Sequence, residues 1–324
     1  MRAIEFENYG GPEVLRVVTA EPPEPGPGQV SIDVAYAGVN FADVKARTEG
    51  YRVPALPFRP GLEASGRVRT LGEGVTGLYP GQPVAAFTPG GSYAEVVVAD
   101  AASVFALPEG YLRVAATLPT VLPTAHALLH EVGRLRPGDT VLVQGAAGGV
   151  GTVVSQLAKA AGAGAVHGVV STEAKAEYAR RYGYDEVFTG PSFAGAVRDA
   201  TGGRGVDLAL DPVGGDSFTQ CLASLATYGR LVAYGNASAS TPWQVSQRDL
   251  FPATASVSGF SLFTLARNAP DALRELTRRA FRAVAEGTVK LPVTAEFPLA
   301  GAPEAHRLLG SRASTGKLLL RVGG

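Results

Sequence analysis

Cysteine is nearly absent: Cys221 is the only one among 324 residues. A single thiol cannot form a disulfide within the chain or build a metal site from several thiolates. The surrounding alanines and leucines favour a small side chain in the core of a helix. The sequence therefore excludes a disulfide-bonded scaffold and a four-cysteine structural zinc lobe.

An excess of charge of one sign is also missing. Lys and Arg together number 29, as do Asp and Glu, so the formal net charge is zero. No basic stripe predicts binding to nucleic acid or to an anionic membrane. No apolar run is long enough to cross a bilayer, and residues 1–7 alternate like a strand without the apolar core of a signal peptide. These absences fit a cytoplasmic enzyme.

The sequence has the composition of an ordinary globular protein, with 46% hydrophobic and 18% charged residues, and it is long enough for two domains. Residues 1–118 contain short β-branched runs between glycine and proline clusters, which predicts a β-rich, barrel-like unit. Residues 119–257 alternate between strands and helices, which predicts a parallel, doubly wound sheet. Residues 258–324 contain an amphipathic helix, Asp271–Glu286, and an apolar end, Gly316–Val322. We expect that end to return to the first domain as a strand, which makes this domain discontinuous.

The expected strands can be placed on the sequence. Those of the first region are Val30–Val34, Ala64–Thr70, Pro83–Phe87 and Tyr93–Val98. Those of the second region are Thr140–Gln144, Ala165–Ser171, Val206–Leu210 and Arg230–Tyr234. Helices are expected between the strands of the second region.

The strongest local signal is the glycine-rich turn Gly145–Gly151, which follows an expected strand and opens an expected helix. A Rossmann turn needs a small residue at its bend, a glycine facing the pyrophosphate, and a glycine where the helix packs on the strand. The pyrophosphate then binds the free N–H groups at the helix N-terminus. Because the context is right, we prefer a dinucleotide site to a turn without a ligand. The candidate contacts are Ala146, Gly148, Gly149, Val150 and Gly151.

The strand after the turn indicates which dinucleotide binds. An NAD site carries Asp or Glu about 20 residues after the turn, which holds the ribose 2′-OH. Here the strand ends in Val170, Ser171 and Thr172 without an acid, and Lys175 follows one helical turn later. A cation without an acid favours the 2′-phosphate of NADPH, whereas Glu173 argues against it and Lys175 could be a solvated lysine. We expect NADPH.

Several separated motifs, in order from end to end, resemble the medium-chain dehydrogenase/reductase superfamily and specifically its zinc-free quinone oxidoreductase branch. They are Gly38–Val44, Pro60–Gly66, Gly145–Gly151, Asp211–Gly215 and Ser311–Lys317. The resemblance implies an α/β protein in which a Rossmann domain, 119–257, is inserted in a GroES-like catalytic domain, 1–118 and 258–324. It also implies an active site in the cleft between the domains, and a homodimer.

The resemblance bears on zinc as well. Alcohol dehydrogenases of the superfamily bind catalytic zinc through Cys, the His of a Gly-His-Glu motif, and a second Cys. In this chain Asn40 matches the first Cys and Leu62 matches the His, and neither side chain ligates zinc. His126 and His130 have metal-ligand spacing on an expected helix, Thr124–Val132, but no further ligand joins them in a recognisable motif. We expect packing or solvent-facing roles for both, and no catalytic metal.

Without zinc, side chains of residues 40–51 become the catalytic candidates. The resemblance implies that Asn40 faces the nicotinamide and that Tyr51 lies near the substrate. Lys45 departs from the quinone oxidoreductase pattern, in which Tyr is frequent at this position. The order Asp-x-Lys resembles that of the enoyl and alkenal reductases of the same superfamily. It is either a donor to the acceptor carbonyl or an exposed helix lysine. Asp43 either orients Lys45 or caps the short helix.

The remaining cofactor contacts also come from the resemblance. It places Gly235, Asn236 and Phe260 near the nicotinamide and Arg312 at the 2′-phosphate, while a family tyrosine is not matched around Phe188–Gly190. The other candidate contacts are Asn40, Thr124, Ser171 and Lys175.

These residues together predict NADPH-dependent hydride transfer to a quinone or an α,β-unsaturated carbonyl compound. Two alternatives stay open at this point. One is an enoyl reductase acting on a biosynthetic, polyketide-like intermediate. The other is a non-catalytic NADPH-binding scaffold.

Overall fold

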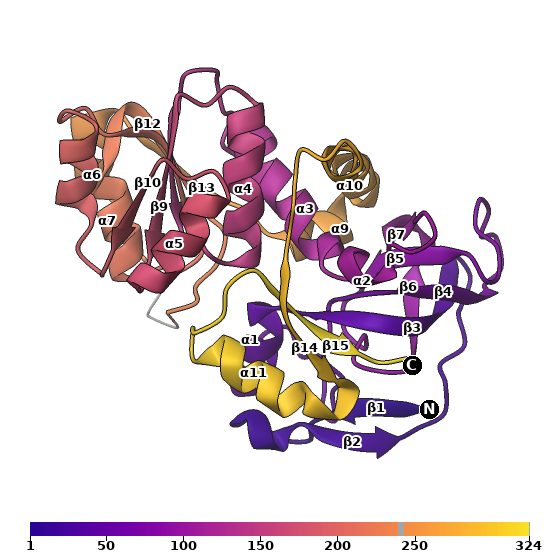
Figure 1. The fold of residues 1–324 in the computed structure, drawn as a ribbon. Helices are drawn as coiled ribbons and strands as arrows, with labels where there is room; N and C mark the ends of the chain where they lie inside the picture. Colours follow the sequence, from indigo (N-terminus) through magenta and orange to yellow (C-terminus); the bar gives the residue numbers. More distant parts are fainter. Residues whose placement is uncertain (239–242, 324) are drawn as a thin grey trace. The chain divides into compact units, whose positions relative to one another are not determined.

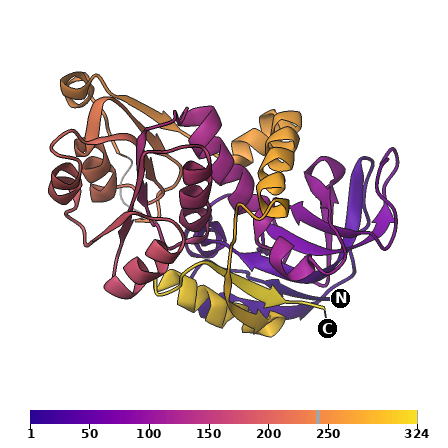
Figure 2. The ribbon, with the colours of Figure 1, turned by 45° about the horizontal axis from the view of Figure 1, so that its top comes forward.

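The computed structural model describes residues 1–238 and 243–323, and it divides into two compact units (Figures 1 and 2). Unit 1 comprises Met1–Val121, Leu265–Thr277 and Leu291–Gly324, and unit 2 comprises Leu122–Thr264 and Arg278–Lys290. Each unit contains its own large sheet. In the described part of the chain, no helix is both long and apolar enough to cross a membrane.

The sheet of unit 2 is six-stranded and parallel throughout, in the order β10-β9-β8-β11-β12-β13. Its strands are β8 (Thr140–Gln144), β9 (Ala165–Val170), β10 (Glu186–Thr189), β11 (Val206–Asp211), β12 (Leu225–Ala233) and β13 (Ser256–Gly259). The order reverses between β8 and β11, which is the switch point where doubly wound sheets bind their ligands. The predicted Rossmann sheet is therefore confirmed.

Helices follow the strands of this sheet. They are α4 (Gly149–Ala160), α5 (Glu173–Arg181), α6 (Ala194–Ala200), α7 (Asp216–Ala223), α8 (Gln247–Leu250) and α9 (Leu262–Asn268). In Figure 1, α4 and α5 lie on one face of the sheet and α6 and α7 on the other. Strands covered on both faces are apolar at every position, as Val141, Leu142 and Val143 are, each fully buried. Cys221 is also fully buried in this core, as predicted.

The large sheet of unit 1 is seven-stranded and mostly antiparallel. Its path is β14-β15-β3-β4-β5-β7, with β6 also pairing with β3. The strands are β3 (Gln29–Val39), β4 (Glu63–Leu71), β5 (Pro83–Phe87), β6 (Val96–Asp100), β7 (Val104–Ala106), β14 (Val293–Pro298) and β15 (Lys317–Arg321). β15 pairs antiparallel with β3, which confirms that the C-terminal segment returns to the first domain. A second sheet joins β1 (Arg2–Glu5) to β2 (Arg16–Thr19).

Two helices of unit 1 frame the site described below, α1 (Phe41–Glu49) and α11 (Ala302–Gly310). The C-terminal segment, yellow in Figure 2, lies against the indigo N-terminal one, and α11 contacts both α1 and the turn Pro12–Val14. The remaining helices are α2 (Leu112–Ala115), α3 (Leu118–His126), which continues as a π-helix over Ala127–Val132, and α10 (Pro270–Ala285).

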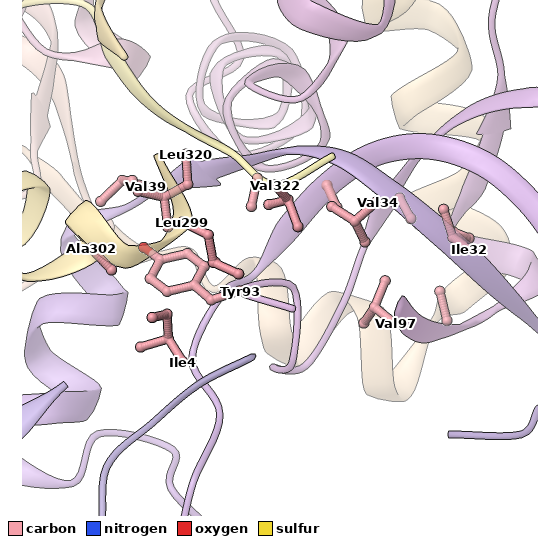
Figure 3. Close-up of a cluster of buried hydrophobic side chains, with 14 of the residues drawn as sticks. Ile4, Ile32, Val34, Val39, Tyr93, Val97, Leu299, Ala302, Leu320 and Val322 are labelled. Atoms are coloured by element: carbon pink, nitrogen blue, oxygen red, sulfur yellow. The ribbon is translucent and has the colours of Figure 1, made fainter. Parts of the chain in front are cut away.

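The core of unit 1 packs around Tyr93, which is 0% exposed. Figure 3 shows its ring between Ile4 and Leu299, which belong to opposite ends of the chain. This packing fixes β15 against β3, because Leu320 belongs to the same cluster. The first residue of β15 is thereby held beside the residue that follows β3.

Candidate functional site

A buried cluster of polar side chains lies where β3 ends and β15 begins. Leu318 pairs with Val39 in the sheet, so Lys317 lies beside Asn40. The Lys317 ammonium is 2.7 Å from both Asn40 Oδ1 and Glu63 Oε1. It also donates to the Val39 carbonyl oxygen at 3.1 Å. The Lys317 side chain is 4% exposed and that of Glu63 0%, so this ion pair is inside the protein.

The Glu63 carboxylate is held from all sides. Its Oε1 accepts from Lys317 and from Asn40 Nδ2, the latter at 2.9 Å. Its Oε2 accepts from the backbone N–H of Thr120 at 2.9 Å and from the Thr120 hydroxyl at 2.7 Å. A buried carboxylate is stable only when its acceptor sites are filled in this way.

Room for that carboxylate comes from Gly38. A Cβ at this position would lie 2.3 Å from Glu63 Oε1 and 2.6 Å from the carbonyl oxygen of Ala116. Both distances are far below van der Waals contact, so only glycine fits. Gly38 in the motif Gly38–Val44 therefore serves the carboxylate of a residue 25 positions further along the chain, on β4 (63 minus 38).

Asp43 caps α1, which decides between the two roles considered for it. Its carboxylate accepts from the backbone N–H of Asn40 at 2.9 Å and from that of Gly61 at 3.0 Å. Burial raises the pKa of Asp43 to about 7, against the opposing effect of these two hydrogen bonds. The cap thus fixes the backbone of Asn40 and ties it to the loop before β4.

A chain of buried polar groups continues from Asp43. The Tyr93 hydroxyl lies 3.4 Å from Asp43 Oδ2 and 3.2 Å from His306 Nε2. Arg47 donates to His306 Nδ1 at 3.3 Å, and also to the carbonyl oxygen of Gly10. Burial, with a smaller effect of Arg47, lowers the pKa of His306 to about 3. His306 is therefore neutral and accepts from Arg47 across the physiological range.

Lys45 lies in the middle of α1, and Tyr51 follows the residue that caps the C-terminus of this helix, Gly50. The Lys45 ammonium is 2.6 Å from Glu49 Oε1, with the lysine side chain 15% exposed. The backbone N–H of Tyr51 donates to the Lys45 carbonyl oxygen at 3.3 Å. Tyr51 is 38% exposed, and the Arg52 guanidinium covers its ring at 5.6 Å from the centroid. Tyr51 is thus tied by its backbone to Lys45, within the helix that Asn40 begins.

The turn Gly145–Gly148 in unit 2 has the backbone of a dinucleotide site. Gly145 takes the left-handed conformation at φ 71°, and Ala146 is fully buried against the sheet. A Cβ on Gly151 would lie 2.6 Å from the Gly145 carbonyl oxygen and 2.7 Å from that of Ala146. A side chain at position 151 would therefore push α4 away from the turn, as the third glycine of the motif requires.

The N-terminus of α4 is open to an anion. Gly148 is its N-cap residue, and no side chain of the described residues caps the helix. The first N–H groups of a helix have no partner within it, so those of Gly149, Val150 and Gly151 point out of its end. Together with the helix dipole, such N–H groups favour an anion at this end of the helix.

The end of β9 is exposed and carries no acid. Ser171 and Thr172 are exposed, and Lys175 is half-buried in the first turn of α5. Glu173 pairs with Arg180 at 2.8 Å along the same helix. Glu173, the acidic residue that argued against a 2′-phosphate, is thus in an ion pair with Arg180.

The other predicted contacts are divided between the units. Unit 2 contains Thr124, Gly235, Asn236 and Phe260. The first of these is 8% exposed. A Cβ on Gly235 would lie 2.6 Å from the Pro212 carbonyl oxygen, which places this loop tightly against the motif Asp211–Gly215. Arg312 is exposed, adopts φ 57° after α11, and belongs to unit 1 together with Asn40, Lys45 and Tyr51.

The two histidines with metal-ligand spacing form a ring pair, with centroids 4.5 Å apart. Burial lowers the pKa of His126 to about 4, helped by the neighbouring His130. No group of three His, Cys, Asp or Glu able to hold a metal ion occurs in the described ranges. The Nδ1 atom of His126 is buried without a hydrogen-bond partner in the same ranges.

Sequence reasoning missed Glu63, Lys317 and Thr120 as parts of the site. Glu63 and Lys317 belong to motifs that carried the family resemblance, but neither was given a role. One signal was available: a lysine opens the buried apolar strand Leu318–Leu320, and lysine is buried only when it is paired. Its partner lies 254 residues earlier, so the sequence does not identify it.

The chain is an α/β protein of two units, of the dehydrogenase type. One unit has a parallel sheet with a glycine-rich turn, and the other has a mostly antiparallel sheet with a buried polar cluster. Residues 26–109 match the alcohol dehydrogenase GroES-like domain family, and residues 149–279 match the family described as zinc-binding dehydrogenase. A quinone oxidoreductase of Pseudomonas aeruginosa is 34% identical, covering 98% of this chain and 99% of its own. The chain therefore belongs to the quinone oxidoreductase-like branch of the medium-chain dehydrogenase/reductase superfamily, and it is an oxidoreductase.

Solved structures agree with this assignment. A mycobacterial protein complexed with NADPH superposes with a TM-score of 0.94 and 36% identity, covering 99% of this chain and 100% of its own. The Escherichia coli quinone oxidoreductase complexed with NADPH gives 0.92 and 31%, with the same coverage. A polyketide synthase of Mycobacterium tuberculosis, mycocerosic acid synthase-like, is 32% identical over 98% of this chain, which spans 15% of that protein.

Proposed function

We propose that this protein is an NADPH-dependent, zinc-independent reductase that transfers hydride to a quinone or to an α,β-unsaturated carbonyl compound. The observation that carries the proposal is the pair of features in unit 2: an uncapped, glycine-lined N-terminus of α4 and a β9 end without an acid. The first fits the pyrophosphate and the second fits a phosphorylated ribose. The complexes of two relatives with NADPH support the same cofactor.

The cofactor supplies the hydride, and the residues of this chain hold and orient the reactants. In unit 2, the N–H groups of Gly149, Val150 and Gly151 bind the pyrophosphate, with Lys175 at the 2′-phosphate. Thr124, Ser171, Gly235, Asn236 and Phe260 are proposed as further contacts. In unit 1, Arg312 is a second cation for the 2′-phosphate, as the family resemblance implies.

Zinc-independence rests on the chemistry of the matched positions. The Asn40 amide is engaged with Lys317 and Glu63, and Leu62 is an apolar side chain that is 8% exposed. Neither is a zinc ligand. Polarisation of the acceptor oxygen then falls to hydrogen-bond donors, for which we propose Asn40, Lys45 and Tyr51.

Initial rates of NADPH oxidation with 1,4-benzoquinone and with an α,β-unsaturated ketone test the proposal. Saturable oxidation with one of them supports a reductase and identifies the class of acceptor. Tight NADPH binding without oxidation in the presence of either would refute it and favour a cofactor-binding scaffold. Size-exclusion chromatography with light scattering tests the homodimer that we propose from the family resemblance.

An enoyl reductase acting on a thioester intermediate is the second candidate. Two observations favour it: Lys45 in the order Asp-x-Lys, and the similarity to a segment of a polyketide synthase. A crotonyl thioester distinguishes the two candidates. Higher kcat/KM with the thioester than with the quinone would favour the second.

We expect Lys45→Ala to lower turnover roughly tenfold or more, with the Kd for NADPH nearly unchanged, because an ammonium near the acceptor donates to its oxygen. Steady-state kinetics and a fluorescence titration measure the two quantities. Glu49→Gln is the matched control: it removes the ion pair but keeps the ammonium. Turnover of Lys45→Ala equal to that of the wild type would remove Lys45 from the mechanism.

A further inference from the structure

We propose that Glu63 and Lys317 are positioning residues that fix the side-chain amide of Asn40 in one orientation, with one N–H presented to an oxygen of the bound reactants. This inference rests on the proposed function, because it assigns Asn40 a donor role in that reaction. Its basis is the polarity of the two charged groups that contact the amide, Lys317 and Glu63; the Thr120 hydroxyl also lies 3.1 Å from Asn40 Oδ1.

The polarity of these neighbours is unambiguous. Lys317 is a donor only, and it lies 2.7 Å from Asn40 Oδ1. The Glu63 carboxylate, in its ion pair with Lys317, accepts, and it lies 2.9 Å from Asn40 Nδ2. A flipped amide would place its oxygen against the carboxylate and its NH₂ against the ammonium. Both hydrogen bonds would then become repulsive contacts, so the pair permits a single orientation.

The hydrogen bonds within the cluster use every donor of Lys317 but only one of the two N–H groups of the Asn40 amide. Lys317 uses its three N–H bonds on Val39, Asn40 and Glu63. Glu63 accepts four hydrogen bonds, two at each oxygen. Asn40 Nδ2 has two hydrogens, and Glu63 takes one of them. Throughout residues 1–238 and 243–323, no acceptor takes the second.

Exposure indicates where that N–H is available. Lys317 and Glu63 are 4% and 0% exposed, and Thr120 is 9% exposed. Asn40 is only half-buried. Asn40 is therefore the most exposed residue of the cluster, which makes its amide the donor that we assign to a ligand, and its backbone is fixed by the Asp43 cap at 2.9 Å.

Stability alone does not explain this arrangement. Burying an ammonium and a carboxylate costs desolvation energy, and a neutral pair of similar volume is often as stable or more so. The charged pair differs from a neutral one because it places a donor, the Lys317 ammonium, at the amide oxygen of Asn40 and an acceptor, the Glu63 carboxylate, at the amide nitrogen. The glycine at position 38, which leaves room for the carboxylate, is a second feature serving the same contact.

A mutant cycle tests whether the pair acts through Asn40. The variants are Asn40→Ala, the double variant Glu63→Gln with Lys317→Met, and the triple variant that combines them. The double variant changes no net charge and replaces the ion pair with side chains of similar size. The glutamine amide that it introduces both donates and accepts, so the amide of Asn40 is free to flip.

We expect Asn40→Ala to lower kcat/KM for the acceptor roughly 10²-fold, and the double variant roughly tenfold or more. The triple variant should lie within about twofold of Asn40→Ala, because residues that act as one unit have non-additive effects. Losses that multiply in the triple variant, or a double variant with wild-type kcat/KM, would overturn the proposal. If the double variant does not fold, Glu63→Gln with Lys317→Gln takes its place in the cycle, since it also removes both charges and keeps a hydrogen-bonding side chain at each position.

A second readout needs neither activity nor cofactor. In ¹⁵N-labelled protein, the Asn40 side-chain NH₂, assigned by its loss in Asn40→Asp, gives two proton signals because rotation about the amide C–N bond is slow. In a fixed amide, the hydrogen bonded to Glu63 should exchange with solvent much more slowly than the other one. The double variant, Glu63→Gln with Lys317→Met, should bring the two exchange rates together. Equal, fast exchange of both hydrogens in the wild type would contradict the fixed orientation. Wild-type protein that oxidises no NADPH but shows the single protected hydrogen would refute the reductase function and leave the orientation standing.

Discussion

The two regions that carry the candidate residues, one in each unit, are built in opposite ways. In unit 2, the turn Gly145–Gly151 is continuous in sequence and works through its backbone, which needs small side chains and nothing else. In unit 1, the cluster of Asn40, Glu63, Thr120 and Lys317 comes from four separate segments and depends on a charged pair, Glu63 and Lys317, and on the polar groups around it. The turn can be replaced only by other small residues, whereas the cluster can be broken by removing a single charge.

This difference tells us where each region is vulnerable. A side chain added to the turn displaces backbone, so it should affect ligand binding before stability. A charge removed from the cluster leaves its partner buried and unpaired, so it should affect stability first.

The largest expected effect is that of Lys317→Met. It leaves the Glu63 carboxylate, 0% exposed, without its ammonium. We expect a loss of about 3 to 5 kcal/mol in the free energy of unfolding, the range for breaking one partner of a buried pair. Urea denaturation followed by circular dichroism measures it. The double variant with Glu63→Gln should recover most of this loss; no recovery would mean that the charge pair is not what matters.

The second effect concerns pH. Burial raises the pKa of Asp43 to about 7 from an ordinary 3.8, so between these values the folded protein holds a proton that the unfolded chain has released. The Asp43 contribution to stability is therefore full below pH 4 and is lost as pH rises through 7. The wild-type free energy of unfolding minus that of Asp43→Asn should fall by on the order of 4 kcal/mol over this window.

A matched measurement exists in unit 2. Burial also raises the pKa of Asp211, so Asp211→Asn should give a change of the same sign. A difference between wild type and Asp43→Asn that stays constant or rises with pH would contradict the assignment of a protonated, buried Asp43.

On the turn, Gly151→Ala should weaken NADPH binding roughly 10²-fold, because its Cβ would lie 2.6 Å from the Gly145 carbonyl oxygen and would move the helix end. Quenching or enhancement of NADPH fluorescence measures the Kd. Gly195→Ala in α6 is the matched control, since no heavy atom lies within 4 Å of its Cβ. That control should bind NADPH normally and gain about 0.5–1 kcal/mol of stability. Equal NADPH affinity of both variants would show that the turn is not the binding site.

The smallest effect is on cofactor choice. Lys175→Ala should raise the KM for NADPH roughly tenfold and leave that for NADH nearly unchanged, because only NADPH carries the 2′-phosphate that the ammonium would pair with. Lys159→Ala is the control, a lysine of α4 whose ammonium lies 2.6 Å from Asp185. A parallel change in both Michaelis constants would exclude a 2′-phosphate role for Lys175.

Most of the fold could be predicted because its signals are local. The strands Thr140–Gln144 and Pro83–Phe87 were predicted with the bounds that the structure has, and the amphipathic helix Asp271–Glu286 is shifted by one residue at each end. Short or polar elements were missed: β10, with no fully buried residue, and α6, whose seven residues include one buried side chain. The expected helix Thr124–Val132 is in part a π-helix, which hydrophobic periodicity does not distinguish.

The site could be predicted only where it is continuous in sequence. Asn40 and the turn were found from motifs, and the Asp43 cap lies within one helical turn of Asn40. Glu63 and Lys317 meet through sheet register, because β15 joins β3 after the chain has passed through the whole of unit 2. The contact between Glu63 and Lys317 follows from the strand topology, so no short stretch of sequence predicts it.

One measurement tests the central claim, an NADPH-dependent reductase, most directly. It is the ratio of kcat/KM for NADPH to kcat/KM for NADH with a single acceptor, obtained from initial rates of cofactor oxidation by the wild-type protein. We expect a ratio of roughly ten or more, from the 2′-phosphate contacts of the β9 end. A ratio at or below one, or no oxidation with any quinone or enone, would contradict the account.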